Sequence, residues 1–340
     1  MKQVYLRQAY DLVTDEVPIP SPEEGTVVIK IEACGICATD VHSYQGETVQ
    51  GNRYPFHPGH EIAGTVFKLG QGVTGLSIGD KVVIDPLYPC ESCDFCRINK
   101  QNHCTSIRTL GIIGPGGFSD YTVIPAKNAF KFDNISFEEA TLAEPLSTVV
   151  YGSGRAEIGV GDRVLINGAG PIGLLHLQVA LHSGSTAVVV TDLNSQKLEI
   201  ARSLGATESI LADEQGKEAR LKKIAPFGFD VVIDCTGIPK VIEQSFMYLK
   251  DSGRLLIFGV CPQESEIKIN PFVIYRRDLK VIGAYASNRT MRTSVDFLEN
   301  KIIKAKELIG EIIPRARLKE MLLLLKEGKV TGKVVVVPKN

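Results

Sequence analysis

The pattern of hydrophobic and polar positions changes near residue 160. Before that point, short apolar runs such as residues 27–31 and 81–84 are separated by stretches rich in glycine and proline, with turn signals such as residues 77–80. Short runs rich in β-branched residues between turn signals predict strands. We therefore expect the first 130 residues to form a β-rich, loop-rich region.

After residue 160, buried-strand runs alternate with helical segments. The first helix is expected at residues 173–181, and strands at residues 162–167, 187–192, 209–211, 230–234, 254–258 and 280–283. This alternation predicts an α/β region with a parallel, doubly wound sheet. From Tyr285 the pattern changes again, with helices expected at 290–299 and 318–327 and a strand at 333–337. We interpret this tail as rejoining the first region.

Composition narrows the class of protein. The 340 residues are 44% hydrophobic and carry a formal net charge of -1, so charge gives no reason to expect nucleic acid or a membrane as a partner. No run of eighteen apolar residues occurs, and Met1 leads into strand-like sequence without a signal-peptide core. We expect a cytoplasmic enzyme in which the eight cysteines are metal ligands or buried thiols.

A glycine-rich turn follows the strand expected at 162–167. Residues 168–173 fit G-x-G-x-x-G, and the assigned cofactor-binding positions are Gly168, Gly170, Pro171, Ile172 and Gly173. Such turns are common, but here a strand precedes the motif, a helix follows it, and an aspartate ends the next strand. The backbone N–H groups of this turn can approach a pyrophosphate at the positive end of the helix. We therefore expect a dinucleotide cofactor.

Asp192, nineteen residues after Gly173, indicates which dinucleotide is preferred. Its carboxylate can accept hydrogen bonds from ribose hydroxyls but would repel a 2'-phosphate, and Leu193 follows it rather than an arginine. NAD is therefore expected over NADP; the alternative is a solvated carboxylate at a strand end. Cys235 and Thr236, after the strand at 230–234, are also assigned to the cofactor site.

Four cysteines in the pattern C-x2-C-x2-C-x7-C predict a structural metal site. They are Cys90, Cys93, Cys96 and Cys104. Four thiolates can close a tetrahedron around zinc and leave no position for a substrate. An iron–sulfur cluster would favour a gap of three residues before the last cysteine and a proline after it, whereas here the gap is seven and Thr105 follows. A zinc ribbon for nucleic acid or four buried thiols fit this spacing and charge less well.

A second metal site is indicated by His60 and Glu61 in the string Gly-His-Glu. A cysteine, a histidine and carboxylates from distant parts of a chain can hold zinc with one position open. This string and the glycines and valine after it match G-H-E-x2-G-x5-G-x2-V, and residues 35–42 contain Cys37. Cys34 and Cys37 also form C-x-x-C, but no thioredoxin-like context surrounds them, so Cys34 is interpreted as a buried thiol.

On these motifs the chain resembles the zinc-dependent medium-chain dehydrogenases, the superfamily of sorbitol (polyol), threonine and alcohol dehydrogenases. The resemblance implies a GroES-like catalytic domain at 1–147, rejoined by 285–340, and a Rossmann NAD-binding domain at 148–284. It also implies two zinc ions per chain. Cys37, His60 and Glu144 would hold the catalytic one, with Glu61 as an alternating or water-linked ligand. The local alternatives are a structural histidine at His60 and a helix-end or loop carboxylate at Glu144.

Glu144 points to a subfamily. It precedes Pro145, Leu146 and Ser147, which is similar to the polyol dehydrogenases; alcohol dehydrogenases carry cysteine there, and threonine dehydrogenases usually Asp-Pro-Phe-Gly. The resemblance implies an enzyme of class EC 1.1.1.- that oxidises a secondary hydroxyl of a polyol or sugar alcohol to a ketone, with NAD as the hydride acceptor. An L-threonine 3-dehydrogenase and a vicinal-diol (butanediol-type) dehydrogenase are the alternatives.

The resemblance also assigns a proton route. Thr39 would hydrogen-bond the reacting oxygen and His42 would pass the proton outward, which suits a histidine near neutral pH. Their alternatives are a turn-capping threonine and a surface histidine. Polyol dehydrogenases often carry an arginine where this chain has Ala286, which argues against sorbitol itself. The candidate pocket residues are Arg53, Tyr44 and Phe118, and a homo-oligomer, dimer or tetramer, is expected.

Two other classes of protein would carry different marks in the sequence. A zinc- and NAD-binding sensor without activity would have lost metal ligands or relay groups, and none is lost here. A zinc-free quinone reductase of the same fold would lack both the four cysteines and the Gly-His-Glu string. Both observations favour the enzyme.

Overall fold

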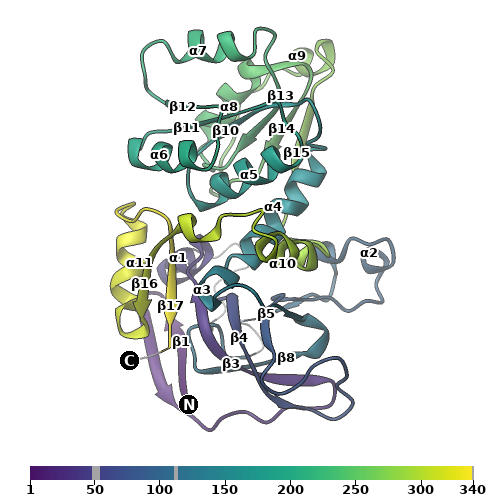
Figure 1. The fold of residues 1–340 in the computed structure, drawn as a ribbon, viewed down its shortest axis with the longest axis vertical. Coiled ribbons are helices and arrows are strands. Elements are labelled where there is room, and N and C mark those ends of the chain that lie inside the picture. The colour runs from purple at the N-terminus through teal and green to yellow at the C-terminus, as the bar shows by residue number, and fades with distance from the viewer. Residues whose placement is uncertain (48–53, 111–113, 339–340) are drawn as a thin grey trace. The chain divides into compact units, whose positions relative to one another are not determined.

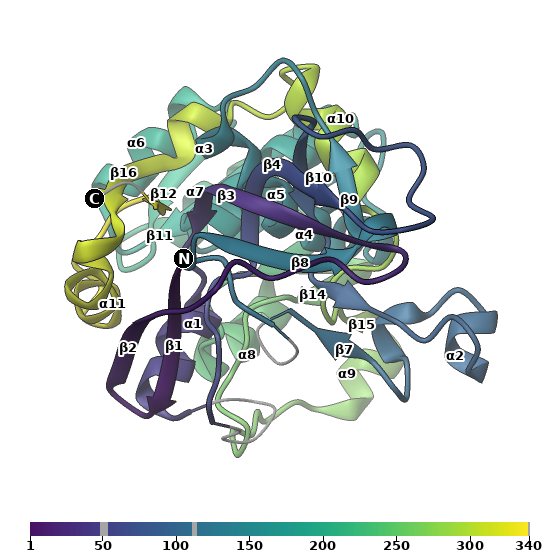
Figure 2. The same cartoon turned by 90° about the horizontal axis from the view of Figure 1, so that it is seen from below.

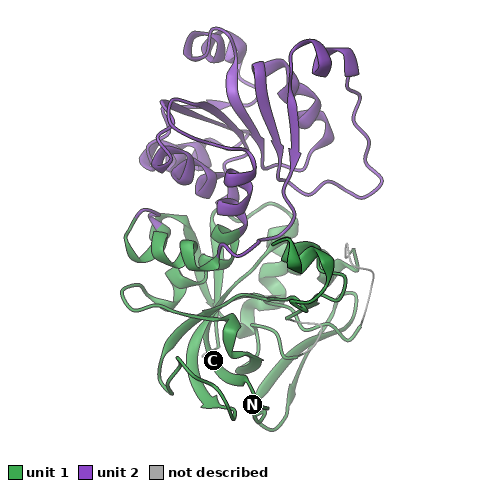
Figure 3. Cartoon of the chain, turned by 90° about the vertical axis from the view of Figure 1, so that its right-hand side faces the viewer, with its two compact units in different colours: residues 1–147, 291–301, 305–340 green, residues 148–290, 302–304 purple. Residues whose placement is uncertain are grey.

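The structure, a computed structural model, describes residues 1–47, 54–110 and 114–338. The chain divides into two compact units (Figure 3). The first contains Met1–Ser147, Met291–Lys301 and Ala305–Asn340, and the second contains Thr148–Thr290 and Ile302–Lys304. The first is β-rich and the second alternates strands with helices, which confirms the predicted α/β fold class.

The first unit is built on a largely antiparallel sheet. Among the described residues its path is β16-β17-β3-β4-β5-β9, and β8 pairs with β3 off this path. These strands are β3 (Thr26–Gly35), β4 (Glu61–Leu69), β5 (Lys81–Ile84), β8 (Tyr121–Pro125), β9 (Ala129–Lys131), β16 (Ile309–Pro314) and β17 (Lys333–Val337). β17 pairs with β3 in the register Val335 to Gly35, so the end of the chain completes the sheet.

Shorter elements surround this sheet. Two further ladders join β1 (Lys2–Gln8) to β2 (Asp11–Glu16) and β6 (Leu87–Tyr88) to β7 (Arg108–Thr109). The helices are α1 (Ala38–Gln45), α2 (Asp94–Arg97), α3 (Phe137–Ala140), α4 (Ala143–Arg155, which continues into the second unit), α10 (Met291–Glu299) and α11 (Leu318–Lys326). The β1–β2 hairpin lies beside α1 (Figure 2): Tyr10 donates its N–H to the Tyr44 carbonyl, and the two rings meet edge to face.

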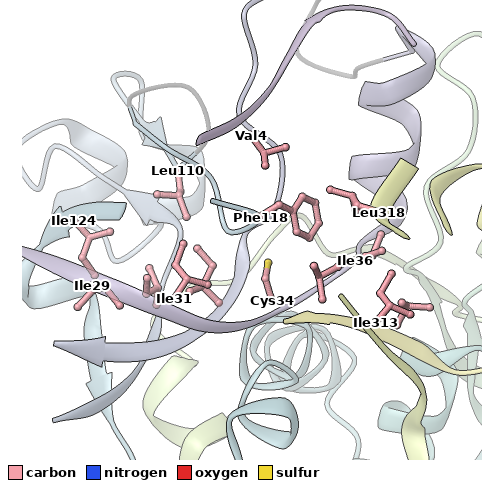
Figure 4. Close-up of a cluster of buried hydrophobic side chains, with 14 of the residues drawn as sticks. Val4, Ile29, Ile31, Cys34, Ile36, Leu110, Phe118, Ile124, Ile313 and Leu318 are labelled. Carbon is pink, nitrogen blue, oxygen red and sulfur yellow. The ribbon is translucent and has the colours of Figure 1, made fainter. Parts of the chain in front are cut away.

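The core of the first unit gathers side chains from both ends of the chain. Figure 4 shows Cys34 of β3 next to Phe118, with Ile31 and Ile29 further along the strand and Ile313 and Leu318 from the C-terminal segment. Ile29 and Ile31 are alternate positions of β3, as expected of a strand, and a register shift between Ile31 and Ala33 brings Cys34 to the same cluster. Burial of these side chains therefore ties the C-terminal segment to β3, whose end leads into the Cys37 segment.

The second unit is a parallel sheet whose successive strands are connected by helices (Figure 1). In the described residues the strand order is β12-β11-β10-β13-β14-β15. The strands are β10 (Arg163–Asn167), β11 (Ala187–Asp192), β12 (Glu208–Leu211), β13 (Phe229–Asp234), β14 (Leu249–Ile257) and β15 (Lys280–Gly283). The order reverses between β10 and β13, and such a switch point is where doubly wound sheets bind ligands.

Helices cover both faces of this sheet. They are α5 (Pro171–His182), α6 (Ser195–Ser203), α7 (Lys217–Ile224), α8 (Pro239–Tyr248) and α9 (Pro271–Arg276). One face buries Leu165, Val189 and Val232 with side chains of α7, α8 and α9. The alternate strand positions, such as Val164 and Val188, are fully buried as well. Burial on both faces explains why these strands read as continuous apolar runs.

Element boundaries differ modestly from the expected ones. α5 begins at Pro171, two residues earlier than predicted, because proline is well suited to the first position of a helix. β14 begins at Leu249 rather than at residue 254. Its pairing with β13 shifts register between Phe229 and Val231 of β13. The run at 254–258 carried the apolar signal, whereas the polar residues before it did not.

Candidate functional site

The four cysteines of the lobe after β6 come together. Their sulfur atoms lie within 4.8 Å of one another, and all eight cysteines of the chain are free thiols. The Cys90 and Ser106 N–H groups approach Cys104 Sγ at 3.3 and 3.4 Å, and the Cys93 N–H approaches Cys90 Sγ at 3.4 Å. Hydrogen bonds from the Ser92 side chain and from the Ser92 and Cys93 amides lower the pKa of Cys90 to about 6. Four sulfurs with amides stabilising the thiolate form fit a zinc ion.

A second group joins Cys37, His60 and Glu61, whose ligand atoms also lie within 4.8 Å of one another. The local fold explains the meeting. β3 and β4 are antiparallel, with Gly35 opposite Glu61, so the residues that follow β3 lie beside those that precede β4. A Cβ on Gly35 would lie 2.0 Å from Glu61 Oε2, so only glycine leaves room for that carboxylate. Soft sulfur, imidazole and carboxylate donors at this spacing suit zinc.

Asp40 supports both segments of this group, and sequence reasoning missed it. Its buried carboxylate accepts the Cys37 N–H at 2.9 Å and the Gly59 N–H at 2.8 Å, and its Oδ1 lies 3.8 Å from His60 Nδ1. Burial alone would lower the pKa of His60, but the charges of Cys37 and Asp40 outweigh it and raise that pKa well above its ordinary value. The available signal was an acidic residue three positions after the helix cap Cys37.

Glu144 lies near this group but not in it. Among the described residues, the set whose ligand atoms are mutually within 4.8 Å does not include Glu144. Glu144 stands in the first turn of α4, and burial raises its pKa to about 7, with the His60 charge opposing and the Glu61 charge adding to the rise. Its role as a zinc ligand stays a prediction.

Thr39 and His42 lie on α1, three residues apart and therefore on one face of the helix. The Cys37 Sγ–H donates to Thr39 Oγ1 at 3.6 Å. His42 is 51% exposed and its Nδ1 lies 3.6 Å from Glu47 Oε2. Thr39 thus lies beside the Cys37–His60–Glu61 group, while His42 is open to solvent.

Two of the three candidate pocket residues are core residues. Tyr44 and Phe118 belong to the hydrophobic core, where only 2% and 1% of each is exposed, so neither lines an open pocket. That expectation was wrong because large aromatic side chains near a motif are more often packing residues. Arg53 lies outside the described residues.

In the second unit, the glycine-rich turn joins β10 to α5. A Cβ on Gly173 would lie 1.9 Å from the Gly168 carbonyl oxygen, which explains the last glycine of the motif. A Cβ on Gly170, the helix cap, would meet nothing within 4 Å, so there is space in front of the helix N-terminus. That space and the free N–H groups fit a pyrophosphate.

The other assigned cofactor residues border the same turn. Asp192 accepts the Ala169 N–H at 2.7 Å and the Asn194 N–H at 2.8 Å, so the carboxylate is fixed at the end of β11. Cys235 and Thr236 follow β13, and a Cβ on Gly168 would lie 3.3 Å from Thr236 Cγ2. These residues therefore gather at the switch point of the sheet.

Two family models match the chain. The alcohol dehydrogenase GroES-like domain matches residues 23–134, and the zinc-binding dehydrogenase model matches residues 171–300. Within residues 1–47, 54–110 and 114–338, no helix is both long and apolar enough to cross a membrane.

Curated relatives match between 78% and 96% of the chain. The chain is 35% identical to a D-altritol 5-dehydrogenase of Agrobacterium fabrum, covering 91% of this chain and 90% of that protein. It is 32% identical to a sorbitol dehydrogenase of Gallus gallus (96% and 93%) and 34% identical to an L-threonine 3-dehydrogenase of Alteromonas mediterranea (78% and 79%).

Solved structures share the fold. A zinc-binding dehydrogenase of Sinorhizobium meliloti bound to NADP matches with a TM-score of 0.92 at 30% identity, covering 99% of each chain. An alcohol dehydrogenase of E. coli complexed with NADH matches with a TM-score of 0.91 at 28% identity, again covering 99% of each. The chain therefore belongs to the zinc-containing medium-chain alcohol dehydrogenase family, as a zinc-dependent dehydrogenase of the alcohol and polyol class.

Proposed function

We propose that the protein oxidises a secondary hydroxyl of a polyol or sugar alcohol to a ketone, with NAD as the hydride acceptor. The observation that carries this is the Cys37–His60–Glu61 group. It offers three protein donors of the kinds found in open, catalytic zinc sites. The similarity to D-altritol and sorbitol dehydrogenases supports a polyol as the substrate class.

We assign two zinc ions to the chain. The structural one is held by Cys90, Cys93, Cys96 and Cys104, and the catalytic one by Cys37, His60 and Glu144, with Glu61 as an alternating or water-linked ligand. Catalytic zinc supplies a Lewis acid that favours loss of the hydroxyl proton. The residues 1–147 with 285–340 would form the catalytic domain, and 148–284 the NAD-binding domain.

The proton leaves through the chain's own side chains. Thr39 accepts a hydrogen bond from the substrate hydroxyl and passes its proton toward His42, on the same face of α1. His42 is exposed and therefore able to release the proton to water. NAD⁺, when bound, would accept hydride from the carbon that bears this hydroxyl, so the alcohol and NAD⁺ would become the ketone, NADH and one proton.

NAD is proposed over NADP because of Asp192. Two backbone N–H groups hold its carboxylate at the end of β11, so it cannot swing away from a bound ribose without losing both bonds. A 2'-phosphate there would face a like charge. A relative that binds NADP shows that the family accommodates both dinucleotides, so the preference rests on this residue.

We also propose a homo-oligomer, a dimer or tetramer. β15 is the edge strand of its sheet, and its Val281 is exposed. Phe272 and Tyr275 on α9 are 64% and 82% exposed. An open strand edge beside exposed aromatic side chains suits pairing with a second copy. Light scattering should report a multiple of the 37.0 kDa chain, and Val281→Lys should lower it.

The test is a screen for NAD⁺ and NADP⁺ reduction over polyols, vicinal diols and L-threonine, with and without a chelator. Turnover on a polyol that the chelator abolishes and zinc restores is the expected result. Cys37→Ser should lose about one zinc per chain and nearly all turnover while NAD still binds. Cys261→Ser, outside both cysteine groups, is the matched control. Turnover on L-threonine or a butanediol would move the assignment to those classes, and zinc and NAD binding with no turnover would favour a sensor.

A further inference from the structure

Lys333 is a buried cation at the start of β17, and its ammonium group reaches the candidate metal site. Its Nζ lies 2.6 Å from Glu61 Oε1 and donates a 3.1 Å hydrogen bond to the Ile36 carbonyl. The two side chains are 7% and 1% exposed. Burial removes both charges from water, so removing either partner would leave the other charge uncompensated.

Only one oxygen of Glu61 is held in this way. Oε2 is buried and, within the described part of the chain, has no hydrogen-bond partner. The same carboxylate belongs to the group with Cys37 and His60, and the missing side chain of Gly35 leaves room for Oε2. A buried carboxylate oxygen without a partner is costly unless a cation satisfies it.

We propose that Lys333 is a positioning residue for the dehydrogenase reaction: by holding Oε1, it leaves only Oε2 of Glu61 available to zinc. This inference rests on the proposed function, since it takes the Cys37–His60–Glu61 group as the catalytic metal site. Carboxylates bind metal ions through one oxygen or through both. Binding through one oxygen keeps a position for the alcohol, which a catalytic zinc site requires.

Lys333 also balances charge around the site. Glu61, Glu144 and the thiolate of Cys37 would place three negative charges near one Zn²⁺, which would weaken its pull on a substrate oxygen. The Lys333 ammonium offsets one of these charges without occupying a ligand position. Outer groups of this kind orient and tune metal ligands, and their loss typically costs about 10- to 100-fold in metal affinity or activity.

Cobalt substitution tests the inference directly, because the visible spectrum of Co²⁺ reports ligand number and geometry without any substrate. In Lys333→Met, Oε1 is released and Glu61 can bind through both oxygens. The cobalt spectrum should change, the KM for the alcohol should rise by about 10- to 100-fold, and NAD affinity should stay unchanged. Lys329→Met, which removes an exposed lysine paired with Glu327 in the same unit, is the matched control.

A wild-type cobalt spectrum and an unchanged alcohol KM in Lys333→Met would overturn the inference. The double variant K333M/E61Q leaves no unpaired buried charge, so it provides the test if K333M alone does not fold. Compared with E61Q alone, it should show the same cobalt spectrum, because Lys333 sets the ligand geometry only through Glu61; a further change in the spectrum would contradict this. A Lys333-dependent cobalt spectrum in a protein that oxidises no alcohol would instead refute the proposed function.

Discussion

His176 should make the stability of the second unit depend on pH in a way that one substitution removes. It is fully buried in α5, its Nδ1 lies 3.2 Å from Ser153 Oγ, and its ring meets Phe258 edge to face at 4.6 Å. Its Nε2 has no hydrogen-bond partner among the described residues. Burial lowers the pKa of His176 to about 3 from the ordinary 6.5. The native protein therefore holds this imidazole neutral.

The direction and size of the pH effect on stability follow from the pKa of His176 in the native and in the unfolded protein. Between pH 6.5 and about 3 the unfolded chain binds a proton here that the native protein does not, so stability falls as pH falls in this window. Each pH unit costs about 1.4 kcal/mol once pH is below 6.5. At pH 5 the loss is therefore about 2 kcal/mol, a sizeable part of a typical stability of about 5–15 kcal/mol.

Urea unfolding of the wild type and His176→Asn at pH 7, 6 and 5, followed by circular dichroism, measures this directly. Asparagine keeps a polar atom near Ser153 but does not titrate, so its stability should fall less steeply with acid. The variant is expected to be less stable at pH 7, because a smaller side chain leaves a cavity. Zinc release in acid affects both proteins alike and cancels in the comparison. Equal pH slopes would refute a neutral, buried His176.

Three further outcomes are expected. Asp40→Asn should weaken zinc binding by about 10- to 100-fold, measured by chelator competition, because Asp40 holds the Cys37 and His60 segments together; unchanged affinity would contradict that role. Cys93→Ser should lose one zinc and lower the melting temperature while changing kcat little. Normal thermal stability without that zinc would count against a structural site. Asp192→Ala should raise the Kd for NAD more than the Kd for NADP, as measured by titration calorimetry. An equal change in both Kd values would show that Asp192 does not select NAD over NADP.

The sequence predicted the fold where the local signal was strong. The runs at 187–192 and 333–337 coincide with β11 and β17, since continuous, valine-rich runs that are buried in the sheet leave little ambiguity. The start of α5 was placed too late because the motif was read from its last glycine, whereas Pro171 begins the helix.

The site was less accessible to sequence reasoning. Cys37, His60 and Glu61 carry a motif, and the structure brings them together. The Lys333 contact with Glu61 spans 272 residues and has no local pattern. Asp40 looked like an ordinary helix residue, and only the folded chain shows both amides it accepts. Long-range contacts of this kind depend on which strands pair, and single-sequence patterns do not encode that pairing.

The pairing of β17 with β3 also bears on how the protein is made. Synthesis proceeds from the N-terminus, so Cys37, His60 and Glu61 leave the ribosome long before Lys333 is added. A nascent chain that ends at α11 has the thiol, the imidazole and the carboxylate, but neither the strand that pairs with β3 at Gly35 nor the cation that holds Glu61. The final arrangement of the metal ligands is therefore reached late in synthesis, only after β17 has left the ribosome and docked on β3.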